Sequence, residues 1–207
     1  MSVKGLEETR GDKKEERRWT AAQLAMTGLM AAVLCILGPV SLPLPFSPVP
    51  ISLGTLAVYL AAVILGGRLG TVSCALYLLL GLAGLPVFSG YAGGAAKLFG
   101  PTGGYLTGYL FLAMTAGAFA GKEGKVWKSG WYSLAGMVLG TLILYVFGTL
   151  WLAWSAGMSF YQALWAGVLP FIPGDLLKMG AALLLGGSVR TALVQAGMLP
   201  SVREKSH

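Results

Sequence analysis

Charged side chains are the scarcest component of this sequence. Only 11% of its 207 residues are Asp, Glu, Lys or Arg, whereas a soluble domain carries about 25%. Hydrophobic residues make up 56% of the chain. This balance excludes an ordinary soluble domain and indicates an integral membrane protein. The length suits one domain of about six membrane spans.

Histidine and cysteine are almost absent as well. The only histidine is His207, and the two cysteines, Cys35 and Cys74, both lie inside apolar runs. The cysteines are typical of small core residues rather than of a disulfide. No Ser/His or paired-carboxylate arrangement indicates catalysis. We therefore expect no enzyme activity, no catalytic residue, no metal site and no cofactor.

Six long apolar runs predict six transmembrane helices and an all-α polytopic membrane protein. The expected spans cover about 19–37, 51–65, 70–85, 105–120, 130–155 and 157–185, the last one interrupted at 170–174. The predicted organisation is a polar cytoplasmic tail over 1–18, a six-helix transmembrane substrate-binding domain over 19–190 and a cytoplasmic tail over 191–207.

Two of the connections between these runs have unusual compositions. The segment 38–50 is rich in proline and uncharged. Because proline removes backbone donors and stops helices, we expect an ordered apolar lid there. The segment 86–104 is rich in glycine, which lets a backbone fold tightly against a neighbour. Its spacing is not that of a phosphate-binding P-loop, so ATP hydrolysis by this chain itself is not expected.

The basic residues predict the orientation in the membrane. With the N-terminus in the cytoplasm, thirteen of the fifteen Lys and Arg residues fall on cytoplasmic segments. The two exceptions, Lys97 and Lys178, fall in the outer half together with Asp175. We therefore expect a multi-pass protein of the cell membrane with both termini cytoplasmic. The net charge of +7 does not indicate nucleic-acid binding, because these basic residues flank apolar runs, where they meet anionic lipid.

An acid and a base stand three positions apart in the last apolar run. Pro173 and Gly174 predict a helix start, which places Asp175 in the first turn and Lys178 on the same helix face. Charges in an apolar segment cost several kcal/mol unless they are paired or hydrated. One interpretation is an ion pair that only locks the helix bundle. The other is a substrate site, which intramembrane ionisable pairs usually mark.

The proline-rich segment, the glycine-rich segment and the interrupted last run all fall on the outer side. We expect them to bring polar side chains toward one apolar pocket. The candidate binding residues are Asp175, Lys178, Tyr105, Lys97, Tyr91 and Thr55. This set suits a small, partly apolar ligand that carries both an N–H donor and an anionic group.

Small residues form a stripe along the first apolar run. Ala21, Ala25, Gly28 and Ala32 follow one another at intervals of three and four, which allows another helix to approach closely. The stripe has two interpretations: packing inside this protein's own bundle, or docking to a partner membrane protein.

Five motifs carry a resemblance to one known family: Pro43–Ile51, Leu56–Leu60, Tyr77–Phe88, Gly100–Leu106 and Pro173–Lys178. They resemble the biotin-specific substrate-binding subunits of energy-coupling-factor (ECF) transporters, called the BioY family. The resemblance covers nearly the whole chain from about residue 18 to 186.

The resemblance implies a six-helix subunit that captures biotin from outside. It also implies association with a transmembrane coupling subunit and with two cytoplasmic ATPases, which use the ATP, and it favours the docking interpretation of the small-residue stripe. Asp175 accepts from the ureido N–H groups of biotin in this interpretation, and Lys178 donates to the ureido carbonyl or to the carboxylate. Whether Lys97 takes the other group stays open. The chain departs from the family at Gly54, where glutamine is usual.

One other class of function fits the sequence. A self-sufficient secondary transporter of a small anionic metabolite would use Asp175 as a proton carrier. A single acid paired with a lysine is a poor relay, however, and inverted repeats are not evident.

Overall fold

The computed structural model describes residues 19–120 and 126–199. Seven helices and one hairpin occur in these segments. In chain order they are α2 (Ala21–Leu37), β1 (Ser41–Leu44), β2 (Ser47–Ser52), α3 (Gly54–Leu82), α4 (Ala95–Leu98), α5 (Gly103–Phe119), α6 (Val126–Ala156), α7 (Phe160–Gly167) and α8 (Ile172–Gln195). The tail 1–18, the basic residues Lys122 and Lys125, and the segment 200–207 lie outside the described residues.

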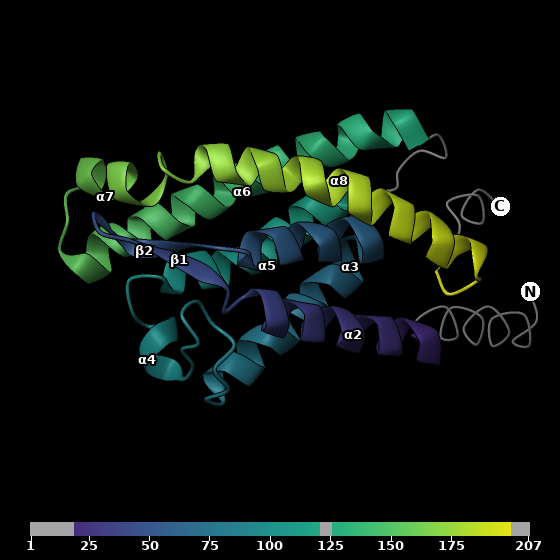
Figure 1. The fold of residues 1–207 in the computed structure, drawn as a ribbon, viewed down its shortest axis with the longest axis horizontal. Helices are drawn as coiled ribbons and strands as arrows, with labels where there is room; N and C mark the ends of the chain where they lie inside the picture. The colour runs from purple at the N-terminus through teal and green to yellow at the C-terminus, as the bar shows by residue number, and fades with distance from the viewer. Residues whose placement is uncertain (1–18, 121–125, 200–207) are drawn as a thin grey trace, which may run out of the picture.

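The long helices run side by side along the longest axis of the molecule (Figure 1). α5 is central and packs most extensively against α6 and α3. The hairpin and α7 lie at one end of the bundle, and the first residues of α2 and the last residues of α8 lie at the other (Figure 1). The mainly helical class is therefore confirmed. α8 continues to Gln195, past the expected limit of the domain at residue 190.

The all-α prediction is wrong for the proline-rich segment, which forms an antiparallel hairpin. Ser41 pairs with Ser52 and Leu42 with Ile51, and the register shifts before the Leu44–Ser47 pair. Both strands of a two-stranded ribbon are edge strands, so prolines that lack an N–H are tolerated there. Ser47 Oγ also donates to the carbonyl oxygen of Ala166 at 2.8 Å, which fixes the hairpin against α7.

The second and third expected spans are the two arms of α3. The backbone leaves helical geometry at Gly66 (φ 81°, ψ 178°), a conformation that only glycine adopts readily. The chain folds back at this point. The evidence is that Gly70 lies close to Ala61: a Cβ at Gly70 would be 3.0 Å from the carbonyl oxygen of Ala61. Arg190 of α8 donates to the carbonyl oxygens of Val63 and Ile64, at 3.2 and 2.8 Å, which satisfies acceptors that the break leaves free.

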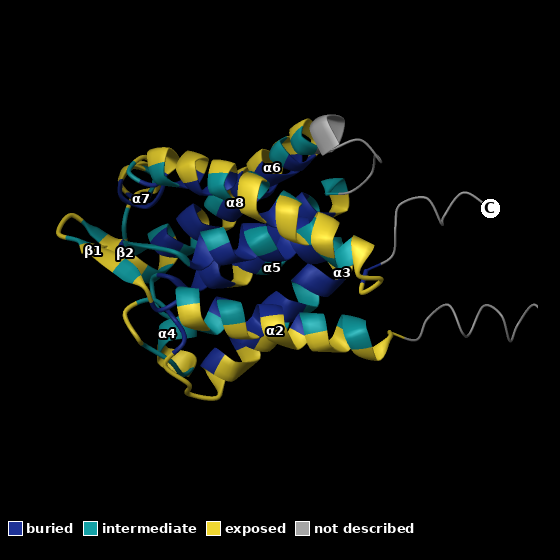
Figure 2. Ribbon diagram, turned by 45° about the vertical axis from the view of Figure 1, so that its right-hand side comes forward, coloured by how far each residue is buried: buried dark blue, intermediate teal, exposed yellow. Residues whose placement is uncertain are grey.

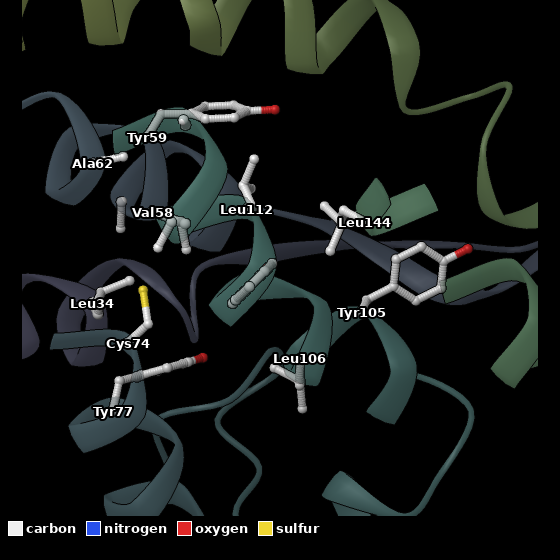
Figure 3. Close-up of a cluster of buried hydrophobic side chains, with 14 of the residues drawn as sticks. Leu34, Val58, Tyr59, Ala62, Cys74, Tyr77, Tyr105, Leu106, Leu112 and Leu144 are labelled. Atoms are coloured by element: carbon white, nitrogen blue, oxygen red, sulfur yellow. The ribbon is translucent and has the colours of Figure 1, made fainter. Parts of the chain in front are cut away.

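The core lies where α2, α3, α5 and α6 meet. Leu34, Val58, Leu112 and Leu144 are almost fully buried there, together with Cys74 (Figure 3). Exposed residues cover the outward faces of the outer helices (Figure 2), and many are large and apolar: Leu177 and Leu184 of α8 are 78% and 76% exposed. Such faces are unusual for a soluble monomer and typical of contact with lipid.

Three helical segments are long and apolar enough to cross a membrane, by length and composition, within the part of the chain that the structure describes. They are Gly54–Leu82, Gly130–Ala156 and Ile172–Gln195, and α2 is a shorter apolar helix. The first of these contains the break at Gly66, so its length does not correspond to a single straight helix.

Candidate ligand site

A pocket opens toward the end of the bundle that carries the hairpin. The empty space in it is about 550 Å³, a figure that includes open solvent at its mouth. The end of α2, the hairpin, both arms of α3, the glycine-rich segment and helices α5, α6 and α8 all contribute to it. The lining residues are Gly38, Val49, Pro50, Ser52, Thr55, Tyr77, Ser89, Thr102, Tyr105, Leu106, Tyr109, Leu144, Tyr145, Phe171, Asp175 and Lys178.

The first two turns of α8 place Asp175 and Lys178 on the pocket wall. α7 ends at Gly167, and α8 begins at Ile172 with proline in its first turn, as the sequence predicts. The N–H of Asp175 donates to the carbonyl oxygen of Phe171 at 2.8 Å. The side chains of Asp175 and Lys178 then form a buried ion pair with Nζ 3.0 Å from Oδ1.

Thr55 completes this ion pair from the first arm of α3. Lys178 Nζ donates to Thr55 Oγ1 at 2.9 Å, and Thr55 Oγ1 donates to Asp175 Oδ1 at 3.1 Å. The ammonium group has three N–H donors, and two of them have partners among the described residues. One donor of Lys178 is therefore available to a ligand.

Tyr145 is a site residue that the sequence analysis missed. Its hydroxyl donates to Asp175 Oδ2 at 2.7 Å from α6. The carboxylate therefore accepts from Lys178, Thr55 and Tyr145, which compensates for its removal from water. The signal in the sequence was a single tyrosine amid the apolar residues Leu142–Phe147. That pattern alone does not show which side of α6 faces a pocket.

Tyr105 lines the pocket, but its hydroxyl donor is already used. It donates to the carbonyl oxygen of Gly167 at 2.9 Å, and the ring contacts the backbone of Gly148, where a Cβ would overlap it. Figure 3 shows the ring extended beside Leu144, with the hydroxyl directed away from the core cluster. Tyr105 thus contributes an aromatic wall and a hydroxyl oxygen that can still accept.

The structure does not bring Tyr91 and Lys97 into the pocket. Tyr91 is 70% exposed and lies in a left-handed conformation (φ 57°) at a turn closed by pairing between Phe88 and Ala92. Lys97 lies half-buried on the short helix α4 and is not a lining residue. Partial burial lowers the pKa of its ammonium group.

The glycine-rich segment contributes different residues to the pocket. Ser89 and Thr102, at its two ends, are lining residues, while the turn between them projects outward. The segment is held against the proline-rich one by a hydrogen bond from the N–H of Gly90 to the carbonyl oxygen of Pro39, at 3.1 Å. The backbone conformation of the glycine-rich segment, rather than its composition, therefore determines which of its polar side chains reach the pocket.

Gly54 lies directly under the hydroxyl of Tyr109. A Cβ at Gly54 would be 2.6 Å from that hydroxyl oxygen and 3.2 Å from Ser52 Oγ. Tyr109 is buried and lines the pocket from α5. The phenol thus occupies the space above position 54, where a longer side chain would have to lie.

The small-residue stripe of α2 faces outward. Ala21, Ala25, Gly28 and Ala32 are exposed, and a Cβ at Gly28 would meet no atom within 4 Å. The face of α2 that packs on the bundle carries Thr27, Met30, Ala31 and Leu34 instead. Within the described residues, the stripe therefore does not pack against this protein's own helices.

Comparison with known proteins places this arrangement in a family. The sequence profile of the BioY family matches residues 12–195. Biotin transporter BioY of Rhizobium etli is 40% identical over 187 residues, which cover 86% of this chain and 96% of that protein. The BioY of Thermotoga maritima is 39% identical over 168 residues, covering 79% and 92%. The chain belongs to the BioY family.

A solved structure of the same kind agrees with this assignment. A crystal structure described as the S-component for biotin from an ECF-type ABC transporter aligns with a TM-score of 0.74 and 30% identity, covering 84% of this chain and 95% of that one. The BioY assignment identifies the chain as a multi-pass membrane protein of a transporter family, not of an enzyme family.

Proposed function

We propose that this chain is the substrate-binding subunit of a biotin uptake transporter, which binds biotin at the outer face of the cell membrane and passes it to an ATP-driven coupling module. The observation that carries the proposal is the buried, hydrogen-bonded cluster of Asp175, Lys178, Thr55 and Tyr145 on the wall of a largely apolar pocket. BioY relatives are named as biotin transporters, which supports biotin as the ligand.

The chemistry of the cluster matches the ureido ring of biotin. That ring has two N–H donors and one strongly accepting carbonyl oxygen. Asp175 accepts from an N–H group, and the remaining donor of Lys178 binds the carbonyl oxygen. Tyr105, Tyr109 and Phe171 provide aromatic surface for the sulfur-containing ring of biotin. No metal ion or cofactor is needed for this recognition.

We propose six membrane crossings with the pocket on the outer side. The crossings are α2, the two arms of α3, α5, α6 and α8, with α7 as an outer half-helix before α8. The start of α2 and the end of α8 lie at the same end of the bundle, away from the hairpin (Figure 1), as an even number of crossings requires. Arg68 follows the break of α3, and Arg190 binds the carbonyl oxygens just before it. Basic residues at this end support a cytoplasmic location.

The exposed stripe on α2 is proposed to bind the transmembrane coupling subunit. Small side chains let two helices approach closely in a membrane, where apolar burial gives no drive to associate. The stripe has no counterpart within this chain to cover it in the described residues. Two cytoplasmic ATPases would complete the module. The ion-coupled secondary transporter is not favoured, since Asp175 is held by three donors rather than free to carry a proton.

Calorimetric titration of the purified full chain with biotin tests the proposal. We expect saturable binding of one biotin per chain, with thiamine, another vitamin of similar size, as the control ligand that does not bind. A chain that is folded, by its cooperative thermal unfolding, and yet does not bind biotin would overturn the proposed function.

A further inference from the structure

A second polar region of the pocket is built around Thr102. Its side chain is 6% exposed, and its hydroxyl oxygen is fully buried without a hydrogen-bond partner among the described residues. It lines the same pocket as Asp175. Buried hydroxyl groups nearly always have a partner, and leaving one unpaired costs free energy. An acceptor that enters the pocket would supply the missing partner.

The helix that Thr102 begins does not use this hydroxyl. Thr102 is the N-cap residue of α5, where a threonine side chain normally accepts a hydrogen bond from the first turn. With φ −87° and ψ −4°, Thr102 makes no such bond. Its hydroxyl is therefore available to a ligand, and removing it should cost the helix nothing.

The start of α5 favours a negatively charged acceptor. α5 has 17 residues and no acidic residue in its first turn. The N–H of Gly103 donates to the carbonyl oxygen of Gly100 at 2.9 Å, but the N–H groups of Gly104 and Tyr105 have no acceptor among the described residues. A helix N-terminus with free N–H groups and no acid carries positive potential, which stabilises an anion.

Tyr77 adds a second hydroxyl from the other arm of α3. It is 1% exposed, lines the pocket, and has no hydrogen-bond partner in the part of the chain that the structure describes. Its ring is held edge-on by Phe88, with 5.4 Å between centroids. Figure 3 shows the ring reaching inward, with its hydroxyl on the side toward Leu106. Gly38 leaves room for this hydroxyl, since a Cβ there would lie 2.6 Å from it.

The two polar regions of the pocket differ in charge balance. Around Asp175, the negative charge of the carboxylate and the positive charge of the Lys178 ammonium group cancel, and Lys178 donates hydrogen bonds within the same cluster. The rest of the pocket lining carries the hydroxyl groups of Thr102 and Tyr77 and no acidic side chain, and the first turn of α5 has no acidic residue either. A ligand with a neutral, donor-rich ring at one end and a carboxylate at the other would satisfy both regions at once.

We propose that Thr102, Tyr77 and the N-terminus of α5 form the subsite for the carboxylate of biotin, while the ureido ring lies at Asp175 and Lys178. This inference rests on the proposed function and extends it, because it assigns the orientation of the ligand. It also removes the need for Lys97 to reach the carboxylate, in accordance with its position outside the pocket lining.

The test compares biotin with an analogue whose side chain ends in a methyl group instead of the carboxylate. Thr102→Val keeps the side-chain shape and deletes the hydroxyl. We expect its affinity for biotin to fall about tenfold, as for loss of one hydrogen bond to a charged group, and its affinity for the analogue to stay within about twofold. Tyr77→Phe should show the same selectivity. Both are measured by calorimetric titration of the full chain.

Thr149→Val is the matched control. Thr149 has the other buried, unpartnered hydroxyl among the described residues, and it does not line the pocket. Its removal should leave both affinities unchanged. Thr102→Val should not lower the unfolding temperature of the ligand-free protein, because it removes an unsatisfied group.

Three results would overturn the subsite. The first is an equal loss of affinity for biotin and for the analogue in Thr102→Val. The second is a lowered unfolding temperature of ligand-free Thr102→Val. The third is a selective loss of biotin affinity in Lys97→Gln but not in Thr102→Val. Failure of the unaltered chain to bind biotin would instead overturn the proposed function itself, so the two failures are distinguishable.

Discussion

The hydroxyl of Tyr145 donates a 2.7 Å hydrogen bond to Oδ2 of Asp175. The other carboxylate oxygen accepts from Lys178 and Thr55. One buried carboxylate therefore ties α8 to α6 and to the first arm of α3, at the wall of the pocket. Changes at this carboxylate should affect both the stability of the bundle and the binding of a ligand, and suitable single and double substitutions can separate the two effects.

Tyr145→Phe should destabilise the ligand-free protein. It removes a hydrogen bond to a buried charged group, which contributes about 1.5–3 kcal/mol. Affinity for biotin should fall less than in Asp175→Asn, because the carboxylate keeps two donors and its charge. Thermal unfolding in detergent and calorimetric titration measure the two effects. Tyr132→Phe, on the exposed side of α6, is the control, and equal unfolding temperatures for both variants would contradict the role of Tyr145.

Asp175→Asn should weaken biotin binding by about ten- to a hundredfold or more. The side chain keeps its shape, but one acceptor becomes a donor that faces the N–H groups of the ligand. Loss of one charge-assisted hydrogen bond in a dry site is worth about 1.5–3 kcal/mol, and about 1.4 kcal/mol is tenfold. Well-folded Asp175→Asn protein with unchanged affinity would reduce the pair to an ion pair that only locks the bundle.

The double variant Asp175→Asn, Lys178→Met separates stability from binding. The single Asp175→Asn change leaves the ammonium group of Lys178 buried without a counter-charge, which is strongly destabilising. Replacing the lysine as well removes that unpaired charge, so the unfolding temperature should recover in the double variant. Biotin affinity should not recover, because both ligand contacts are gone. Recovery of both properties would show that neither side chain contacts biotin.

Gly54→Ala should destabilise the protein through Tyr109. The added Cβ would lie 2.6 Å from the hydroxyl oxygen of Tyr109, and forcing extra atoms into a packed site costs about 1–3 kcal/mol. Tyr109→Phe removes the clashing oxygen, so the double variant should be more stable than the sum of the single effects predicts. A double-mutant cycle of unfolding free energies checks this, and strictly additive effects would show that the two positions do not interact.

Ala25→Trp should abolish assembly with the coupling subunit without affecting biotin binding by the isolated chain. A bulky side chain in the middle of the exposed stripe prevents close helix approach. Leu29→Trp is the control, since Leu29 is already a large apolar side chain, 58% exposed, beside the stripe. Co-purification with the coupling subunit measures assembly. Loss of biotin binding in Ala25→Trp would instead show that the stripe is needed for the folding of this chain itself.

Cysteine labelling tests the proposed orientation. In a background with Cys35 and Cys74 replaced by alanine, single cysteines at positions 47 and 91 should react with a membrane-impermeant reagent applied from outside the cell. A cysteine at position 125, in a basic segment that the sequence predicts to be cytoplasmic, should react only after permeabilisation. Labelling of position 125 from outside intact cells would show that the proposed orientation is wrong.

Local chemistry allowed the sequence to predict much of this protein. The apolar runs located the long helices to within a few residues at α2, α5 and α6, because a membrane helix needs about 20 apolar residues and ends where polar residues or glycine begin. The helix start near Pro173 and the i, i+3 spacing fixed the Asp175–Lys178 pair, because both depend only on neighbouring positions. The family motifs supplied the expectation of biotin.

The tertiary structure decided which other residues join this pair. Thr55 and Tyr145 lie 120 and 30 positions from Asp175 in the sequence, and the rotation of each helix about its axis determines whether such a side chain faces the pocket. An almost uniformly apolar helix has no polar face from which that rotation can be read, so only packing against its neighbours sets it. The outward turn at Tyr91, the inward position of Thr102 and the fold-back at Gly66 likewise depend on contacts between segments far apart in the chain.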